Sequence, residues 1–162
     1  IMARKGEHFH LKEGGLLGSV AEAVVRNSGK PVIVTPENFI EIESMAIAYD
    51  GSEPAKKALK FSIDFSEKTA WPLTAIIITS DSKKAAALAD EIEDSLEDRS
   101  ADCATITLQG KETEEIINYI KEGAVELMAM GAFGHNRLRS LIMGSTTSHV
   151  IQKSTIPVLL TR

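Results

Sequence analysis

The sequence has little cysteine, little positive charge and no long apolar run, and each shortage excludes a class of protein. One cysteine among 162 residues, Cys103, cannot form an internal disulfide, and its place in an expected strand indicates a small core residue. Acidic residues outnumber basic ones by 23 to 18, and the resulting net charge of -5 repels a nucleic-acid backbone. No apolar run reaches the length of a membrane span. We expect a globular protein of the reducing cytoplasm without nucleic-acid or membrane partners.

What the chain does contain is a regular alternation of apolar strands and amphipathic helices. Apolar or β-branched runs predict strands at residues 45–49, 73–79, 104–108, 125–130 and 157–161. Helical spacing of apolar side chains predicts helices at residues 54–68, 83–99, 114–122 and 145–153. Parallel neighbouring strands need crossover connections, so this order predicts an α/β fold with a doubly wound, five-stranded parallel sheet.

The fourth expected strand leads into a glycine pattern that carries most of the functional information. Gly131, Gly134 and Gly144 are followed by Ser145 and Thr146, which gives G-x2-G-x9-G-[ST]. Glycines let a ligand approach main-chain N–H groups, and the hydroxyl residues open a helix whose first N–H groups favour an anion. The pattern predicts a phosphate cradle. The alternative is that the glycines are turn residues and Ser145 is an ordinary N-cap.

An internal repeat links the two ends of the chain. Residues 18–35 and 144–161 align without a gap and are identical at seven of 18 positions, where composition alone gives roughly one. Residues 1–3 then correspond to residues 129–131. We therefore expect that residues 1–36 are the final third of a preceding domain, that residues 37–44 are a linker and that residues 45–162 are a complete domain.

These features resemble the universal stress protein family over residues 43–161. Its ATP-binding members carry G-x2-G-x9-G-[ST] after the fourth strand, residues 48–54 (A-Y-D-G-S-E-P) are similar to its opening motif, and residues 157–160 are similar to its closing strand. The resemblance implies a Rossmann-like fold of the adenine nucleotide alpha hydrolase-like type, with strand order 3-2-1-4-5. Such a sheet binds ligands at the carboxyl ends of strands 1 and 4, where the strand order reverses.

By this resemblance, Asp50 and the main chain at Ala48 contact adenosine, and the backbone of Thr79 meets adenine. The alternative for Asp50 is an ordinary turn residue of an Asp-Gly pair. The nucleotide-binding set implied by the family is Ala48, Asp50, Thr79, Met130, Gly131, Gly134, Gly144, Ser145 and Thr146. Three further side chains between the glycines are expected to be solvated and are alternatives for a terminal phosphate contact: His135, Arg137 and Arg139.

The sequence offers little support for catalysis. It has no G-x4-G-K-[ST] loop, no further acid at a strand end that would hold magnesium, and no hydrolase motif. His8 and His10 have no further metal ligands at a suitable spacing. We therefore expect no catalytic residue and no metal site, and we expect Gly131→Val or Gly144→Val to abolish nucleotide binding while the fold survives.

The resemblance implies a cytoplasmic stress-response protein that acts as a nucleotide-responsive regulatory module. Its ligand would be ATP, or AMP or ADP in its place, and Mg²⁺ could accompany the nucleotide. Two alternatives stay open: a nucleotide-free dimerisation module and a weak ATPase. The family also implies that residues 31–35 and 157–161 pair as antiparallel strands, either between domains of one chain or in a homodimer.

Overall fold

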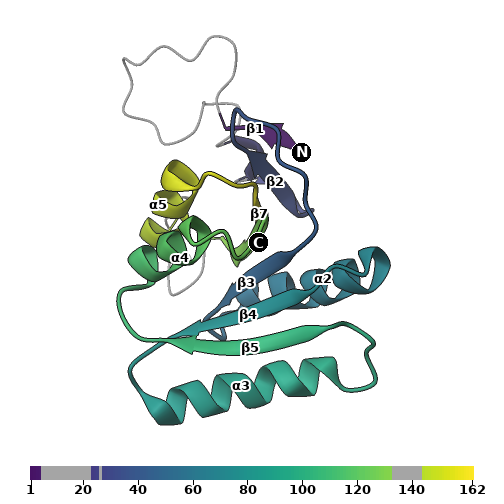
Figure 1. The fold of residues 1–162 in the computed structure, drawn as a ribbon, viewed down its shortest axis with the longest axis vertical. Coiled ribbons are helices and arrows are strands. Elements are labelled where there is room, and N and C mark those ends of the chain that lie inside the picture. The colour runs from purple at the N-terminus through teal and green to yellow at the C-terminus, as the bar shows by residue number, and fades with distance from the viewer. Residues whose placement is uncertain (5–22, 26, 133–143) are drawn as a thin grey trace.

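The computed structural model describes residues 1–4, 23–25, 27–132 and 144–162. Helices and strands alternate from residue 45 onward, as the apolar periodicity predicts (Figure 1). The strands are β1 (Met2–Ala3), β2 (Val32–Thr35), β3 (Met45–Tyr49), β4 (Leu73–Ile78), β5 (Cys103–Leu108), β6 (Leu127–Gly131) and β7 (Val158–Thr161). The helices are α2 (Glu53–Thr69), α3 (Ser82–Leu96), α4 (Glu112–Lys121) and α5 (Ser145–Lys153).

All the strands in the described part of the chain join one sheet in the order β1-β2-β7-β6-β3-β4-β5. Read from β5 to β7, the five strands of the main domain follow the expected order 3-2-1-4-5 and are parallel. The fold class is therefore confirmed. The sheet is larger than expected, with seven strands and not five, because β2 pairs with β7 and β1 adds to β2.

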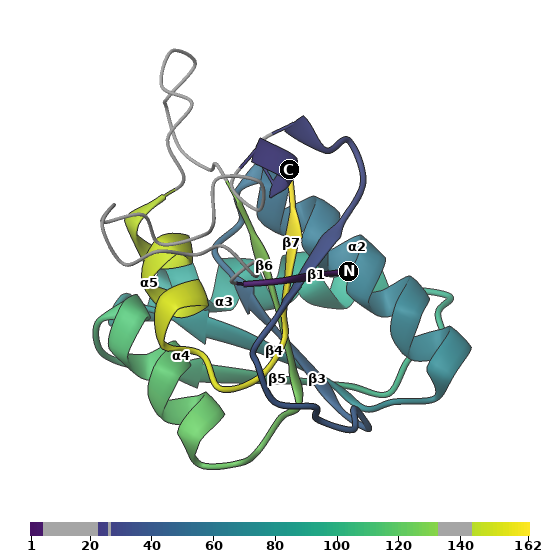
Figure 2. The same cartoon turned by 90° about the horizontal axis from the view of Figure 1, so that it is seen from above.

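The two faces of the sheet carry separate apolar layers. Helices α2 and α3 pack on one face and α4 and α5 on the other, so the central strands are covered on both sides (Figure 2). Successive side chains of a strand point to opposite faces. In β3, Ala46 accordingly joins the layer of α4 and α5, while Met45 and Ile47 join the layer of α2 and α3. Covering on both faces explains why β3, β4 and β6 read as nearly continuous apolar runs.

Residues at the two ends of the chain repeat the same strand pairing. Strands β1 and β2 pair in parallel with Met2 opposite Val34, and β6 and β7 pair in parallel with Met130 opposite Leu160. These are corresponding positions of the internal repeat. Strands β2 and β7 then pair antiparallel about the Ile33–Leu159 pair, so a local twofold axis relates the two halves. The predicted pairing of residues 31–35 with 157–161 is present, within one chain.

The turn before the last strand of each repeat also has the same hydrogen bonds. The Ser28 hydroxyl donates to the Lys30 carbonyl and accepts from the Lys30 N–H, at 2.8 and 3.1 Å. The Ser154 hydroxyl does the same with Ile156, at 2.7 and 3.2 Å. The repeat in the sequence is therefore a repeat of backbone geometry.

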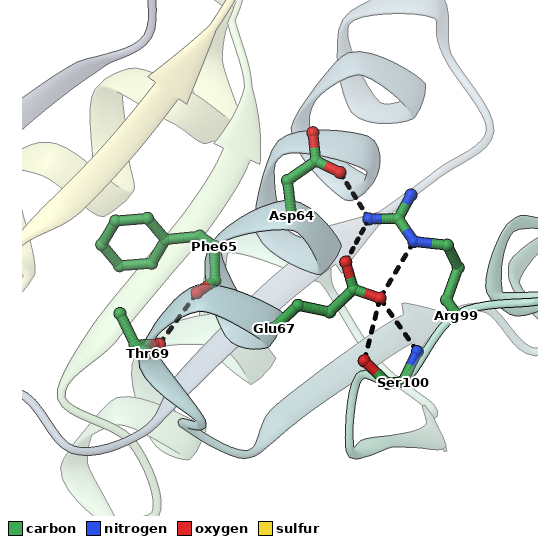
Figure 3. Close-up of polar contacts among 6 residues, drawn as sticks. All are labelled: Asp64, Phe65, Glu67, Thr69, Arg99 and Ser100. Atoms are coloured by element: carbon green, nitrogen blue, oxygen red, sulfur yellow. Dashed lines mark hydrogen bonds and ion pairs between the residues drawn. The ribbon is translucent and has the colours of Figure 1, made fainter.

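At the amino end of the strands, Arg99 fastens the segment after α3 to the end of α2 (Figure 3). Its guanidinium donates to both carboxylate oxygens of Glu67, at 3.0 and 2.6 Å, and also to Asp64. The Ser100 N–H donates to Glu67 at 2.9 Å. Hydrogen bonds from Arg99, helped by the one from Ser100, lower the pKa of Glu67 from its ordinary value of 4.5 to about 2.

This low pKa gives a testable pH dependence. A carboxylate whose pKa is lower in the folded state stabilises the fold above its unfolded pKa, and this stabilisation disappears as the pH falls through the folded value. We expect wild type to be more stable than Glu67→Gln at pH 7. The difference in free energy of unfolding between the two proteins should narrow as the pH falls from 4.5 to about 2. Urea unfolding of both proteins across this pH range measures the difference. A difference that does not change with pH would contradict a lowered pKa of Glu67 in the folded state.

Candidate functional site

The structure places three of the expected site residues at one edge of the sheet. Asp50 follows β3, Thr79 follows β4 and Gly131 ends β6. Because β3 lies between β4 and β6, with Ala48 opposite Met130, all three belong to the carboxyl edge. After β3 the chain adds β4 and β5 on one side of β3, and then adds β6 and β7 on its other side. The strand order therefore reverses between β3 and β6. In open α/β sheets this point is the usual location of a ligand.

Asp50 organises the turn between β3 and α2. One of its carboxylate oxygens accepts the Ser52 N–H at 2.9 Å, and Gly51 adopts a positive φ of 79°. Ser52 then caps α2 by accepting the Ala55 N–H at 3.3 Å. The Asp50 side chain is exposed. Asp50 therefore has the turn role that was the alternative, in a position from which a carboxylate can also face a ligand.

A polar contact behind this turn fixes β3 to two helices. Tyr49 is 3% exposed, and its hydroxyl donates to Glu91 of α3 at 2.7 Å. Burial, followed by the hydrogen bond to Glu91, raises the pKa of Tyr49, so the phenol stays protonated. Lys56 of α2 forms an ion pair with the same carboxylate at 3.5 Å. A Cβ on Gly51 would lie 2.8 Å from Leu88 Cδ2 of α3, a side-chain end that can move aside, so it is the positive φ that favours glycine there.

Gly131 is required by packing. A Cβ at this position would lie 2.7 Å from the Ala55 N and 2.8 Å from the Pro54 carbonyl carbon, both main-chain atoms of α2. Main-chain atoms cannot move aside as the end of a flexible side chain can. The Thr161 hydroxyl donates to the Pro54 carbonyl at 2.8 Å and holds α2 in this place. The expectation that Gly131→Val leaves the fold intact is therefore wrong, because valine would force α2 away from β6.

Gly144 differs from Gly131 in both conformation and space. Its φ of -57° and ψ of 146° are open to any residue, and among the described residues a Cβ would meet only the Thr147 hydroxyl, at 3.8 Å. It precedes α5 as the N-cap residue, and the first helical hydrogen bond runs from the Ser148 N–H to the Gly144 carbonyl, at 2.9 Å. The described part of the structure does not demand glycine here.

The amino end of α5 lies against β6 and has no side-chain cap among the described residues. The Thr147 hydroxyl donates to the Gly131 carbonyl at 3.2 Å, and Thr147 is 4% exposed. Ser145 is exposed and Thr146 is half-buried, and the first turn contains no acidic residue. A helix start that no described side chain caps presents N–H groups and a positive dipole end, the combination that favours a phosphate or carboxylate.

Thr147 is the residue that the sequence reasoning did not identify. It joins the strand that ends in Gly131 to the helix that begins after Gly144, so it sets the spacing between the two parts of the glycine pattern. A signal existed: a β-branched hydroxyl residue in the first turn, directly after Ser145 and Thr146, is suited to bond a neighbouring carbonyl. Its partner, however, becomes visible only in the fold.

Three other expected residues contribute in different ways. Met130 is 5% exposed and belongs to the apolar layer under α4 and α5, so only its main chain is available to a ligand. Ala48 is half-buried beside the same layer. The Thr79 N–H donates to Leu108 at 3.0 Å and its hydroxyl accepts the Asp81 N–H at 3.2 Å. A contact between the Thr79 backbone and adenine would therefore use the carbonyl oxygen.

Several sequence expectations lie outside the described residues. These concern Gly134, His135, Arg137 and Arg139 in the glycine pattern, and His8 and His10 near the start. Within the described ranges, no group of three or more His, Cys, Asp or Glu residues could hold a metal ion. Cys103 is half-buried, not fully in the core, and burial raises the pKa of its thiol to about 11.

In the part of the chain that the structure describes, no helix has the length and apolarity needed to cross a membrane.

Comparison with known proteins gives a consistent match. A model of the Universal stress protein family matches residues 41–162. A universal stress protein of Synechocystis sp. is 35% identical over 161 residues, which cover 98% of this chain and 56% of the relative. The chain therefore spans about half the length of that curated relative. A universal stress protein structure from Archaeoglobus fulgidus is 27% identical, with a TM-score of 0.74, and the match covers 91% of this chain and 55% of that one.

Some structures with the same fold contain nucleotides. An Archaeoglobus fulgidus universal stress protein in complex with dAMP is 16% identical with a TM-score of 0.60, covering 76% of this chain and 100% of that one. An Arabidopsis thaliana family protein with AMP bound is 12% identical with a TM-score of 0.56, and the match covers 73% of this chain and 90% of that one. A further universal stress protein, in complex with cAMP, is 17% identical with a TM-score of 0.62, and the match covers 75% of this chain and 98% of that one. At these identities the similarity to this chain concerns the fold.

Proposed function

The chain belongs to the universal stress protein family, and from this we propose that it binds an adenine nucleotide at the carboxyl ends of β3 and β6. The phosphates would lie at the amino end of α5, next to Gly131 and Gly144. The family members with bound AMP, dAMP and cAMP support an adenine nucleotide as the ligand. We propose ATP as the physiological nucleotide, with AMP and ADP as alternatives.

The observation that carries the proposal is the start of α5. Helices α2 and α3 begin with a side-chain cap, from Ser52 and Asp81, and the first turn of α4 contains three glutamates. Helix α5 begins with Gly144, no described side chain caps it, and hydroxyl residues fill its first turn. The caps of α2 and α3 already bond N–H groups of their first turns, and the glutamates of α4 would repel a phosphate, so among the described helices α5 has the start best suited to receive one.

The other half of the site would recognise the nucleoside. The Asp50 carboxylate can accept hydrogen bonds from ribose hydroxyls or from the adenine amine, and it would repel a phosphate. The Thr79 carbonyl lies at the same sheet edge, two strands from Gly131. The acidic and the uncapped parts of the site thus suit opposite ends of one nucleotide. Mg²⁺, if present, would enter with the phosphates.

At the level of the cell, we propose a cytoplasmic regulatory module of the stress response whose contacts change when the nucleotide binds. We further propose a tandem arrangement, in which residues 1–36 are the last third of a first domain, residues 37–44 a linker and residues 45–162 the second domain. The twofold relation between β1–β2 and β6–β7 supports the tandem arrangement. Both edges of β7 are paired within the chain, which favours a domain contact over a homodimer through that strand.

Thermal unfolding with and without millimolar ATP and Mg²⁺ tests the proposed binding. A ligand at a hundred times its dissociation constant should stabilise the fold by about 2.7 kcal/mol, which shifts the Tm by several degrees. Adenosine without phosphates serves as the matched ligand control and should give a smaller shift, because it cannot use the start of α5. Equal shifts with ATP and adenosine would remove the phosphate site from the proposal, and no shift with either would refute nucleotide binding.

A further inference from the structure

An arginine outside the matched family domain holds the helix that begins at the phosphate site. Arg4 directly follows β1, whereas the family match starts at residue 41. One nitrogen of its guanidinium, Nη1, donates to the carbonyls of Ile151, Gln152 and Ser154, at 3.0, 3.1 and 3.1 Å. These carbonyls belong to the last residues of α5 and its C-cap.

The chemistry of this contact stabilises α5. The last carbonyls of a helix have no partner within the helix, and a cation is favourable beside them because the dipole is negative at this end. Lys153 already stands in the last turn, but Arg4 adds direct hydrogen bonds from another part of the sheet. The main chain of Arg4 is itself fixed, because its N–H donates to the Thr35 carbonyl at 3.0 Å.

Helix α5 is thereby attached at both ends. At its start, Thr147 donates to the Gly131 carbonyl of β6, and at its end Arg4 bonds the terminal carbonyls. The helix has only nine residues, so a displacement of its end is passed to its start. Arg4 corresponds in the internal repeat to Ala132, since both donate their N–H to the threonine that ends the neighbouring strand. Alanine has no donor in its side chain, so Ala132 cannot make the side-chain contact that Arg4 makes with the end of α5.

We propose that Arg4 is a positioning residue for the nucleotide site: it holds α5 so that the first N–H groups of the helix meet the phosphates. This inference rests on the proposed function. It means that the segment before the matched domain contributes to nucleotide affinity without touching the nucleotide. A ligand or partner that pulls Arg4 from α5 would weaken nucleotide binding at the opposite end of the helix.

The test compares Arg4→Ala with a matched arginine variant. Arg99 also makes several hydrogen bonds, but it joins α2 to the segment after α3 at the amino edge of the sheet. We expect Arg4→Ala to raise the Kd for ATP by three- to tenfold and Arg4→Lys to recover part of the loss, because lysine keeps the charge and some donors. Arg99→Ala should lower the Tm without changing the Kd. Calorimetric titration well below the Tm of each variant measures these values.

Amide hydrogen exchange without nucleotide provides a second readout. Arg4→Ala should speed the exchange of the amides at 148–153 several-fold, whereas Arg99→Ala should leave them at the wild-type rate. Unchanged exchange in Arg4→Ala would overturn the inference, and so would an unchanged Kd beside normal wild-type binding. If wild type itself fails to bind ATP, the proposed function is refuted together with the positioning role, and the exchange data then show only whether Arg4 holds α5.

Discussion

Replacing Gly131 with alanine is expected to lower the free energy of unfolding by about 2 kcal/mol, whereas the same change at Gly144 is expected to alter it by less than about 0.5 kcal/mol. At Gly131 the added methyl group would lie 2.7 Å from the Ala55 N and 2.9 Å from the Pro54 Cβ. Helix α2 must then move away from β6, which disturbs the apolar layer between them. The cost is that of inserting a group into a fully packed interior.

At Gly144 two small effects oppose each other. Alanine is a poorer N-cap residue than glycine, which destabilises the helix, but it restricts the unfolded chain more, which stabilises the fold. The conformation of Gly144 is open to alanine, and the nearest atom of the described residues to the added methyl group is the Thr147 hydroxyl oxygen at 3.8 Å. Urea unfolding of wild type and both variants measures the difference. Equal losses in the two variants would contradict the packing role of Gly131.

Replacing Gly144 with aspartate is expected to stabilise the fold by about 1 kcal/mol and to weaken ATP binding by more than about a hundredfold. Gly144 already has an extended conformation, in which an aspartate side chain can accept N–H groups of the first turn. The variant therefore gains a helix cap. The same carboxylate would occupy the place proposed for the phosphates, and two like charges about 5 Å apart repel by about 3 kcal/mol at an effective dielectric constant of 20.

Gly144→Asn is the matched control for this variant. Asparagine has the same shape and caps a helix equally well, but it carries no charge. Its affinity for ATP should fall less than that of the aspartate variant, so the difference between the two isolates the charge. Titration of ATP into both proteins, with urea unfolding in parallel, measures affinity and stability. Similar affinities in the two variants would show that the phosphates do not lie at the start of α5.

Much of the fold could be predicted from local patterns. The apolar runs of β3 and β4 and the helical stripe of α2 are long and regular, and burial on both faces leaves few polar interruptions. Strand order is a different matter, because it depends on contacts between distant segments. It came from the family resemblance and not from periodicity. The sheet has two further strands, β1 and β2, which the internal repeat indicated, and the family resemblance implied the pairing of β2 with β7.

The site shows where local patterns stop being informative. The sequence marked Gly131 and Gly144 as equivalent members of one motif, but the first is fixed by the backbone of α2 and the second is not. That difference depends on how closely α2 approaches β6, which is set by tertiary packing. Arg4 and Ile151 are 147 positions apart, and no spacing rule links them. Thr147 likewise needed the fold to reveal its partner.

The measurement that tests the central claim most directly is an NMR titration of the ¹⁵N-labelled chain with ATP, repeated with adenosine. Binding with the phosphates at α5 predicts that ATP shifts the amide signals of Ser145, Thr146 and Thr147 strongly and that of Gly131 as well. Adenosine should move signals near Asp50 and Thr79 and leave the α5 amides nearly unchanged. ATP-induced shifts that spare α5, or that adenosine reproduces there, would contradict the proposed site.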